Sequence, residues 1–374
     1  MQRNAVKALV LAAGVGTRLD PLTKSVPKPL VPIGNRPVME HVLRLLKHHN
    51  ITDVSANLHY MADMIPEYFK GLSDLGQDLH FVKEEVLSGD AGGMRACKQY
   101  LKGSTFIVLM GDIITDIDLS YLVSRHKRSG ALASIALKPV DDVQHFGVAR
   151  LDQKGLIQEF QEKPQPEEAI SNLASTGIYV FEPEIFDYIP GSGDYMFGKE
   201  LFPKLLRMGV PINGVRVLGH WADIGTIDAY KQASFDAVSG VIDIEMPENH
   251  FHSDREHQIF VAKNSSLHMG KNCIVSPGTR VVGNVIIGDN CNIGPGCVLE
   301  DSIIWSDTTI ARDARITNSI IGHNCLVQAG SRKDNAAIVQ DSHIAPDLSV
   351  KLAKLRQHAD INGFVSNSRM HRSA

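Results

Sequence analysis

A short turn near the N-terminus carries the residue types that phosphate binding requires. Residues 11–30 read LAAGVGTRLDPLTKSVPKPL and follow an apolar run, Ala5 to Val10, that is typical of a buried strand. Small residues make up the turn, so its backbone N–H groups can approach an anion with no side chain in the way. Arg18 and Lys28 add two cations close by. The turn is therefore predicted to cradle a triphosphate through Leu11, Ala12, Ala13, Gly14, Gly16 and Thr17.

Two better-known phosphate loops do not fit this turn. A dinucleotide fingerprint needs a third glycine three residues after Gly16, and that position is Leu19. A P-loop needs Gly-Lys-Ser/Thr after its spacer, and the chain has none here. What remains is the string Gly-x-Gly-Thr-Arg followed by Pro27-Lys28-Pro29, in which the two prolines stiffen the backbone around the lysine.

A carboxylate suited to a hard metal ion follows the apolar run Thr105 to Met110. Asp112 comes directly after that run and Gly111. Oxygen ligands of this kind are the ones that Mg²⁺ prefers. An aspartate in such a place also commonly caps a helix, so both roles fit the pattern.

The elements that must position these residues alternate along the first 235 residues. This alternation predicts an α/β domain with a mostly parallel sheet and helices on both faces. Ligands of such sheets bind beyond the carboxyl ends of the strands, so the Gly14 turn and Asp112 are expected to share one cleft. The expected helices are Val38–His49 and Ala91–Tyr100, and the expected strands are Asp53–Leu58, Leu79–Val82 and Thr105–Met110.

A second domain is predicted from an aliphatic residue that recurs at steps of six, with an occasional step of five. A hexapeptide period of this kind is typical of a β-helix, in which the aliphatic side chains point inward and stack. The recurring residues are Met269, Val275, Val281, Ile287, Ile293, Leu299, Ile304, Ile310, Ile316, Ile321 and Val327. The expected boundaries are a first domain over 1–243, a linker over 244–263, the β-helix over 264–340 and a tail over 341–374 with a short capping helix, Asp347–His358.

Composition limits the function classes. The chain has 374 residues and a formal net charge of −4, which does not favour a nucleic-acid or membrane partner. No segment approaches the roughly 18 apolar residues of a membrane span. The five cysteines contain no C-x-x-C pair, and we expect reduced thiols and a cytoplasmic location. Sixteen histidines are scattered, so a zinc site is not favoured.

These motifs resemble the sugar-1-phosphate nucleotidyltransferases (NDP-sugar pyrophosphorylases), over residues from about 5 to about 335. The similarity is greatest to the two-domain mannose-1-phosphate guanylyltransferase type, which joins a Rossmann-like catalytic domain to a left-handed β-helix. The resemblance implies a Mg²⁺-dependent enzyme that joins a nucleoside triphosphate to a sugar 1-phosphate. In that comparison Arg18 and Lys28 contact the triphosphate and Asp112 holds the metal.

The resemblance also supplies a second metal ligand and a sugar-phosphate site. Asp223 lies in a segment, residues 221–225, that resembles the family's W-x-D-I/V-G element, and it is expected to complete the metal site. In Glu162-Lys163-Pro164, Lys163 can pair with the incoming phosphate and Glu162 can accept hydrogen bonds from sugar hydroxyls. Gly147 and Thr176 match two further sugar-binding motifs, although Ser175 replaces the family's usual Asn.

The base-binding segment, residues 83–93, departs from the family pattern. It is one residue longer, and Asp90 replaces Thr. Glu85 is expected to accept the ring N–H and the amine of guanine, beside Gly92 and the backbone of Leu11 and Ala12, which favours GTP.

Several functions remain open. The first choice is GTP with mannose 1-phosphate, and the alternative is UTP or dTTP with glucose 1-phosphate. A non-catalytic regulatory relative that binds nucleotide sugar is a different class, and acyl transfer by the β-helix is a third. We interpret the β-helix as an assembly module and expect a homo-oligomer.

Overall fold

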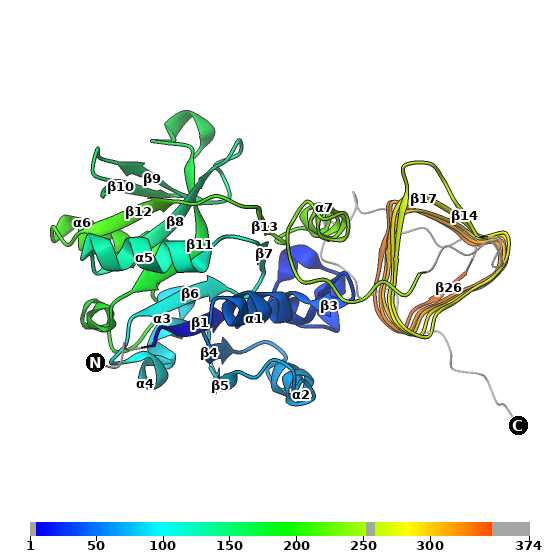
Figure 1. Cartoon of the computed structure of the whole chain (residues 1–374), viewed down its shortest axis with the longest axis horizontal. Helices are drawn as coiled ribbons and strands as arrows, with labels where there is room; N and C mark the ends of the chain where they lie inside the picture. The colour runs from blue at the N-terminus through cyan, green and yellow to red at the C-terminus, as the bar shows by residue number, and fades with distance from the viewer. Residues whose placement is uncertain (1–4, 252–258, 346–374) are drawn as a thin grey trace, which may run out of the picture. The chain divides into compact units, whose positions relative to one another are not determined.

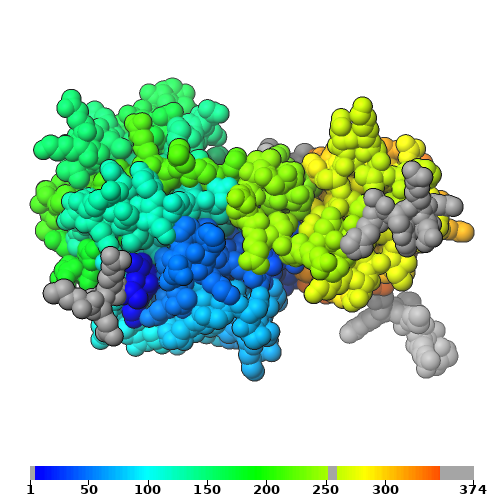
Figure 2. Space-filling model, viewed as in Figure 1, coloured from blue at the N-terminus to red at the C-terminus, as the bar shows by residue number. Residues whose placement is uncertain are grey.

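A nine-stranded sheet organises the first of the two units into which the chain divides, 1–248 and 249–374. The computed structural model describes residues 5–251 and 259–345, and each unit is considered by itself (Figure 1). In the space-filling view the segments of the first unit, coloured blue to green, pack against one another as one continuous body (Figure 2).

The sheet combines a parallel half with an antiparallel half. Its order is β10-β9-β11-β6-β1-β4-β5, and β8 joins β11 to β12. β1 pairs in parallel with β4 and β6, and β4 with β5, as the alternating pattern predicts. β11 runs antiparallel to β6, and β9 and β10 form an antiparallel hairpin because only five residues connect them. The strands are β1 (Lys7–Leu11), β4 (Asp53–Leu58), β5 (Asp78–Lys83), β6 (Phe106–Met110), β8 (Ala133–Pro139), β9 (Gly147–Leu151), β10 (Ile157–Glu162), β11 (Leu173–Phe181) and β12 (Ile212–Arg216).

The helices pack around this sheet. The expected helix Ala91–Tyr100 is interrupted at Cys97, which separates α3 (Gly89–Ala96) from α4 (Lys98–Leu101). A buried aromatic cluster on β6, β11, η6 and α6 joins sheet to helices, and Phe106, Phe181, Phe197 and Phe202 form its centre. The other α-helices are α1 (Val38–His48), α2 (Met64–Lys70), α5 (Leu119–Ser129), α6 (Phe202–Arg207) and α7 (Ile227–Val238). Shorter turns are η1 (Thr17–Leu19), η2 (Leu22–Lys24), η3 (Lys28–Leu30), η4 (Pro166–Glu168), η5 (Pro183–Tyr188) and the π-helical η6 (Phe197–Leu201).

Two small sheets complete the first unit. β7 (Ile113–Thr115) pairs antiparallel with β13 (Trp221–Asp223), although more than a hundred residues separate them. β2 (Pro32–Ile33) and β3 (Arg36–Pro37) form the other pair. After β13 the chain enters α7, where the Thr226 hydroxyl accepts a hydrogen bond from the N–H of Ala229 at 3.2 Å and caps the helix.

The second unit is a parallel β-helix. Most strands in successive coils pair in parallel at a separation of 17 or 18 residues, as in the series Val275, Ile293, Ile310, Val327 and Ile344. The first pair, β14 with β17, has a separation of 20 residues. The recurring aliphatic residues from Val275 to Val327 are buried, whereas Met269 is half-buried. The strands are β14 (Phe260–Val261), β15 (Ser266–Met269), β16 (Ile274–Val275), β17 (Arg280–Ile287), β18 (Asn292–Ile293), β19 (Val298–Ile304), β20 (Thr309–Ile310), β21 (Arg315–Thr317), β22 (Ile320–Ile321), β23 (Leu326–Val327), β24 (Arg332–Asp334), β25 (Ala337–Ile338) and β26 (His343–Ile344).

Asparagine and aspartate turn the corners of the coils. One column of corner residues has positive φ, a conformation that these short polar side chains tolerate. Three neighbouring pairs in this column are hydrogen-bonded from coil to coil, for example Asn290 Nδ2 to Asp307 Oδ1 at 2.9 Å. The column comprises Asn272, Asn290, Asp307, Asn324 and Asp341.

The β-helix extends beyond the expected boundaries at both ends. β14 lies within the expected linker and pairs with β17, and β26 lies within the expected tail and pairs with β23. The expected helix Asp347–His358 lies outside the described residues. No helix of the described part is long and apolar enough to cross a membrane.

One buried histidine makes the stability of the first unit depend on pH. His41 on α1 is buried and hydrogen-bonded through Nε2 to the Ile33 carbonyl at 2.9 Å. The pKa of His41 is lowered to about 4, chiefly by burial and also by the nearby Arg36 and Arg44. At pH 6.5 and below, His41 therefore binds a proton in the unfolded chain, whereas in the folded chain it stays neutral until the pH approaches about 4.

We predict that His41→Gln weakens the acid sensitivity of folding. Below pH 6.5 the unfolded wild-type chain binds the extra proton, so its free energy of unfolding falls as pH falls toward about 4. Between pH 7 and pH 5 this one group accounts for about 2 kcal/mol. Urea unfolding at the two pH values should show a smaller loss in His41→Gln than in wild type or in the exposed control His145→Gln. Equal losses in all three proteins would contradict the assignment.

Candidate active site

A cavity of about 380 Å³ opens where β1 and β6 end. Leu11 and Met110 are paired as the last residues of these strands, and Gly111 N–H donates to the Leu11 carbonyl at 2.8 Å. A Cβ on Gly111 would lie 2.9 Å from that carbonyl oxygen, so only glycine permits this approach. The first part of the small-residue turn, residues 11–14, thus shares one cavity with Asp112, whereas Gly16 and Thr17 do not line it. Its lining is Leu11, Ala12, Ala13, Gly14, Lys28, Pro29, Asn57, Glu84, Leu87, Gly89, Asp90, Met110, Gly111, Asp112, Asp194 and Met196.

Lys28 lies between the two expected metal carboxylates. Its ammonium group donates to Asp112 Oδ2 and lies 3.7 Å from Asp223 Oδ1. The Lys28 side chain is only 8% exposed, so these charges interact with little screening by solvent. Two acidic residues more than a hundred positions apart in the chain therefore meet at one cation.

The β7–β13 pair is what brings the two carboxylates together. Asp112 immediately precedes β7, and Asp223 at the end of β13 lies opposite Ile113. The N–H of Ile224 donates to the Asp112 carbonyl at 3.2 Å and extends the pairing by one residue. A two-stranded sheet with fixed register thus sets the separation of the carboxylates.

The environment of Asp223 suits a divalent cation. Burial and the neighbouring Asp112 carboxylate raise the pKa of Asp223, while Lys28 and Arg18 oppose that shift. Asp223 Oδ1 is buried and has no hydrogen-bond donor in the described part of the chain. A buried carboxylate oxygen without a donor, beside a second carboxylate, fits the oxygen-donor set that Mg²⁺ takes.

Arg18 extends over the same site from η1. Its guanidinium lies 4.0 Å from Asp223 Oδ2, and its side chain is 58% exposed. The guanidinium also lies against Gly225, because a Cβ added there would be 2.9 Å from Arg18 Nη2. Gly16 has φ +74, and a Cβ on it would lie 3.0 Å from Lys28 Cβ, so this glycine lets the turn close onto the lysine.

At the other end of the cavity, the candidate base-binding carboxylate is Glu84 and not the expected Glu85. Glu84 is 8% exposed and lines the cavity, whereas Glu85 is exposed and does not. Asn57 joins Glu84 to the turn: its Oδ1 accepts from Ala12 N–H at 3.1 Å, and its Nδ2 donates to Glu84 Oε1 at 2.7 Å. Ser88 donates to the other oxygen of Glu84. The extra residue in this segment is the sequence signal that could have shifted the assignment by one position.

Gly92 lies inside α3 and does not line the cavity. A Cβ on it would lie 2.6 Å from Ser88 Oγ, so this glycine allows the helix to approach the serine that binds Glu84. Its role is therefore in packing the base-binding segment.

The expected sugar-phosphate residues Gly147, Glu162 and Lys163 lie together at the ends of β9 and β10. Gly147 pairs with Glu162, and Lys163 N–H donates to the Phe146 carbonyl at 3.0 Å. Lys163 has φ +48, a conformation that is costly for a residue with a side chain and is concentrated at functional sites. Its side chain is 59% exposed, and its ammonium lies 4.0 Å from Glu162 Oε1. These residues do not line the 380 Å³ cavity.

The expectation for Thr176 is wrong. Thr176 is fully buried, and its hydroxyl donates to the Ala136 carbonyl at 3.1 Å. Alternation along β11 turns the neighbouring Ser175 to the opposite face, where its hydroxyl donates to Tyr179 Oη at 3.2 Å. The Thr176 side chain therefore supports the sheet and is not available to a ligand.

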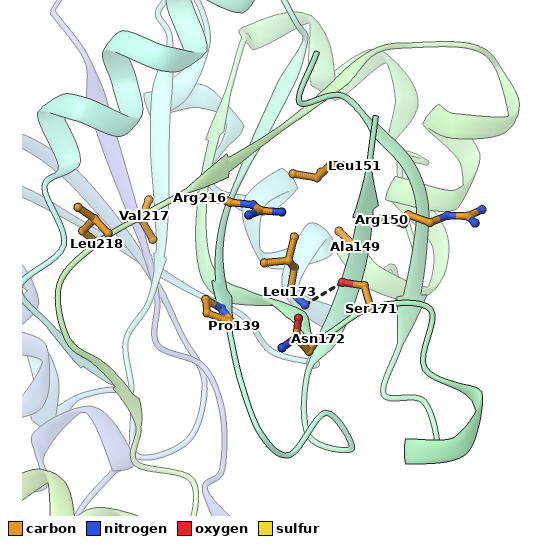
Figure 3. Close-up of a pocket in the computed structure, with 10 residues that line it drawn as sticks. All are labelled: Pro139, Ala149, Arg150, Leu151, Ser171, Asn172, Leu173, Arg216, Val217 and Leu218. Carbon is orange, nitrogen blue, oxygen red and sulfur yellow. Dashed lines mark hydrogen bonds between the residues drawn. The ribbon is translucent and has the colours of Figure 1, made fainter. Parts of the chain in front are cut away.

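A larger cavity, of about 510 Å³, lies on the β8–β9–β11–β12 part of the sheet (Figure 3). Arg150 and Arg216 border it, while Leu151 and Leu173 supply apolar surface. Arg150 is already paired with Glu159 at 2.6 Å. This cavity contains no carboxylate and none of the predicted site residues, so its size alone does not make it the candidate active site.

Comparisons with known proteins match both units of the chain. A family model described as "Nucleotidyl transferase" matches residues 7–239, and one described as "GMPPB C-terminal domain" matches residues 263–370. A UTP–glucose-1-phosphate uridylyltransferase of Synechocystis sp. is 34% identical over 334 residues, covering 84% of this chain and 86% of the relative. A mannose-1-phosphate guanylyltransferase of Mycobacterium tuberculosis is 30% identical over 306 residues, covering 80% of this chain and 84% of the relative.

Solved structures support the fold. An apo UDP-glucose pyrophosphorylase superposes with a TM-score of 0.56 at 21% identity, over 64% of this chain and 100% of that one. HddC from Yersinia pseudotuberculosis superposes with a TM-score of 0.53 at 23% identity, over 61% of this chain and 98% of that one.

The mixed sheet and its helices form an α/β nucleotidyltransferase domain. With the family model matching more than half of its length, this chain belongs to the nucleotidyl transferase family, among the sugar-1-phosphate nucleotidyltransferases. These enzymes act on a nucleoside triphosphate and a sugar 1-phosphate.

We predict that Gly225→Ala displaces the Arg18 guanidinium. If Arg18 contacts the triphosphate as expected, this displacement should lower kcat/KM about tenfold or more, because a misplaced cation stabilises the transition state less well. Only the end of a flexible side chain must move, so the melting temperature should stay near that of wild type. Gly191→Ala, which adds a methyl group to open space, is the matched control. Wild-type kcat/KM in Gly225→Ala, or an equal loss in Gly191→Ala, would exclude this positioning role.

Proposed function

We propose that this protein is a Mg²⁺-dependent enzyme that joins GTP and mannose 1-phosphate to give GDP-mannose and pyrophosphate. The observation that carries the proposal is the placement of Lys28 between Asp112 and Asp223, at the edge of a turn rich in backbone N–H groups. Anion-binding and cation-binding groups lie side by side there, as transfer between phosphates requires.

Different residues of the chain bind the triphosphate and the sugar phosphate. The turn and Lys28 bind the triphosphate, and Arg18 neutralises charge that develops on the α-phosphate, to which its planar fork is suited. Lys163 and Glu162 hold the sugar phosphate. An oxygen of the sugar phosphate forms a bond to the α-phosphorus as the bond to the β-phosphate breaks, and pyrophosphate leaves. No side-chain nucleophile is needed.

Asp112 and Asp223 would hold the Mg²⁺ ion. No group of three or more acidic, histidine or cysteine side chains converges within the described ranges 5–251 and 259–345. Two carboxylates nevertheless suffice, because protein-bound Mg²⁺ commonly takes its remaining ligands from substrate phosphates and water. When bound, the ion supplies charge neutralisation for the phosphates.

The preference for one nucleobase over another depends on Glu84. A carboxylate can accept both the ring N–H and the exocyclic amine of guanine, which supports GTP. Both oxygens of Glu84 already accept a hydrogen bond, from Asn57 and from Ser88, and this supports the second candidate, UTP with glucose 1-phosphate. The relatives divide in the same way, since their names include both a guanylyltransferase and a uridylyltransferase.

Pyrophosphate release, measured for four nucleoside triphosphates against several sugar 1-phosphates, tests the proposal. GTP with mannose 1-phosphate should give the highest kcat/KM. Glu84→Gln should lower kcat/KM for GTP about 10- to 100-fold, because guanine loses a charged acceptor, and should affect UTP less. The exposed neighbour offers the matched control Glu85→Gln, which should not change the preference.

Three other results would each redirect the proposal. A preference for UTP that Glu84→Gln leaves intact would favour the uridylyltransferase alternative. A loss in Glu85→Gln would restore the original assignment of the base-binding residue. No turnover of any pair with Mg²⁺ present would overturn the enzyme proposal in favour of a regulatory nucleotide-sugar-binding protein.

A further inference from the structure

Asp116 is a carboxylate outside the active-site cavity whose two oxygens accept hydrogen bonds from distant parts of the chain. Oδ1 accepts from His220 N–H at 2.5 Å, and Oδ2 accepts from Asp243 N–H at 2.9 Å. The Asp116 side chain is only 13% exposed, so water competes weakly for these bonds. Asp116 thus joins three segments, namely the end of β7, the residue before β13 and the chain after α7.

The chain that leads into β13 is shaped around Asp116. Gly219 has φ +97, and a Cβ on it would lie 2.4 Å from Asp116 Oδ1, so glycine is required for this approach. The Asp116 N–H donates to the His220 carbonyl at 3.3 Å, and the Thr115 hydroxyl donates to the same carbonyl at 2.6 Å. The imidazole Nδ1 of His220 lies 3.4 Å from Asp116 Oδ2. Both backbone polar groups of His220 are therefore held by the end of β7.

The β7–β13 pair needs such support because it is short. Each strand has three residues, and a two-stranded sheet of this size is marginally stable by itself. A slip of one residue in the pairing would turn every side chain of β13 to the opposite face. The Asp223 carboxylate would then leave Lys28 and Asp112. The hydrogen bonds of Asp116 oppose this slip at the end of the pair that lies away from the active-site cavity.

The chemistry of a carboxylate suits this position. Two backbone N–H groups arrive from two different segments, and each is bound by a different oxygen. An amide offers only one acceptor oxygen beside its donor group, and a hydroxyl has a single oxygen. Asp116 lies four residues after Asp112, which is about 13 Å along an extended strand, so it acts on the metal site through β13.

We propose that Asp116 is a positioning residue for nucleotidyl transfer. By holding the backbone of His220 it sets the register of β13, and this register places the Asp223 carboxylate beside Asp112. The inference rests on the metal role that the proposed function gives to Asp112 and Asp223. It adds that a residue remote from both the substrate and the ion controls the affinity for the ion.

Mn²⁺ binding, followed by electron paramagnetic resonance in parallel titrations with GTP and with UTP, tests this inference in the full chain. Asp116→Ala should weaken Mn²⁺ binding about tenfold, as the loss of groups that orient metal ligands does. In the Asp223→Asn background the same substitution should have little further effect, because the carboxylate through which it acts is already missing. A merely structural role of Asp116 would not depend on Asp223 in this way.

Asp118→Ala is the matched control, two positions further along the chain. The Asp118 carboxylate accepts from Tyr121 N–H at 2.9 Å and caps α5, so its backbone hydrogen bond stabilises a helix instead of β13. Both alanine variants should have lower melting temperatures than wild type, since each loses backbone hydrogen bonds. Only Asp116→Ala should lose Mn²⁺ affinity.

Asp116→Asn is the second variant in case Asp116→Ala does not fold, because the amide keeps the shape and one acceptor oxygen. It should weaken Mn²⁺ binding about threefold or more. Three results would each overturn this inference and leave the metal assignment standing: wild-type Mn²⁺ affinity in the folded Asp116 variants, an equal loss in Asp118→Ala, or the full loss repeated in the Asp223→Asn background. Wild-type affinity in Asp223→Asn itself would overturn the metal assignment of the proposed function.

Discussion

The candidate site depends on holding two carboxylates against one buried cation. Asp112 and Asp223 would repel each other at this separation, and in the structure the Lys28 ammonium lies between them. The β7–β13 pair fixes the carboxylates, and the turn before η3 fixes the lysine. Because each backbone segment is set by pairing or packing, the charges are positioned before any substrate arrives, and this reduces the cost of reorganisation on binding.

Glycines set how closely these segments approach one another. Gly111 brings β6 against the end of β1, Gly16 lets the phosphate turn close on Lys28, and Gly225 leaves space for the Arg18 guanidinium. In each case a methyl group would lie 3.0 Å or less from a neighbouring atom. The geometry of the site therefore depends on close backbone contact as well as on its charged side chains.

Local patterns in the sequence predicted much of this structure, and long-range packing accounts for most of the rest. The run before the Gly14 turn and the alternating segments after it indicated the parallel strands, and the six-residue period indicated the coils. The prediction that Thr176 contacts the substrate is wrong, because the motif does not reveal which face of β11 a residue occupies. The choice of Glu84 over Glu85 depends on Asn57, which lies on another strand. The hydrogen bond from Phe197 N–H to Asp90 joins two residues more than a hundred positions apart, which no local pattern predicts.

Divalent-metal affinity tests the central claim without relying on turnover. Mn²⁺, as a paramagnetic substitute for Mg²⁺, can be titrated by electron paramagnetic resonance in the presence of GTP. We expect Asp112→Asn and Asp223→Asn each to weaken Mn²⁺ binding about tenfold or more while retaining the wild-type circular dichroism spectrum, since each removes one of two protein ligands. Wild-type Mn²⁺ affinity in either folded variant would contradict the account, because the two carboxylates would then not hold a common ion.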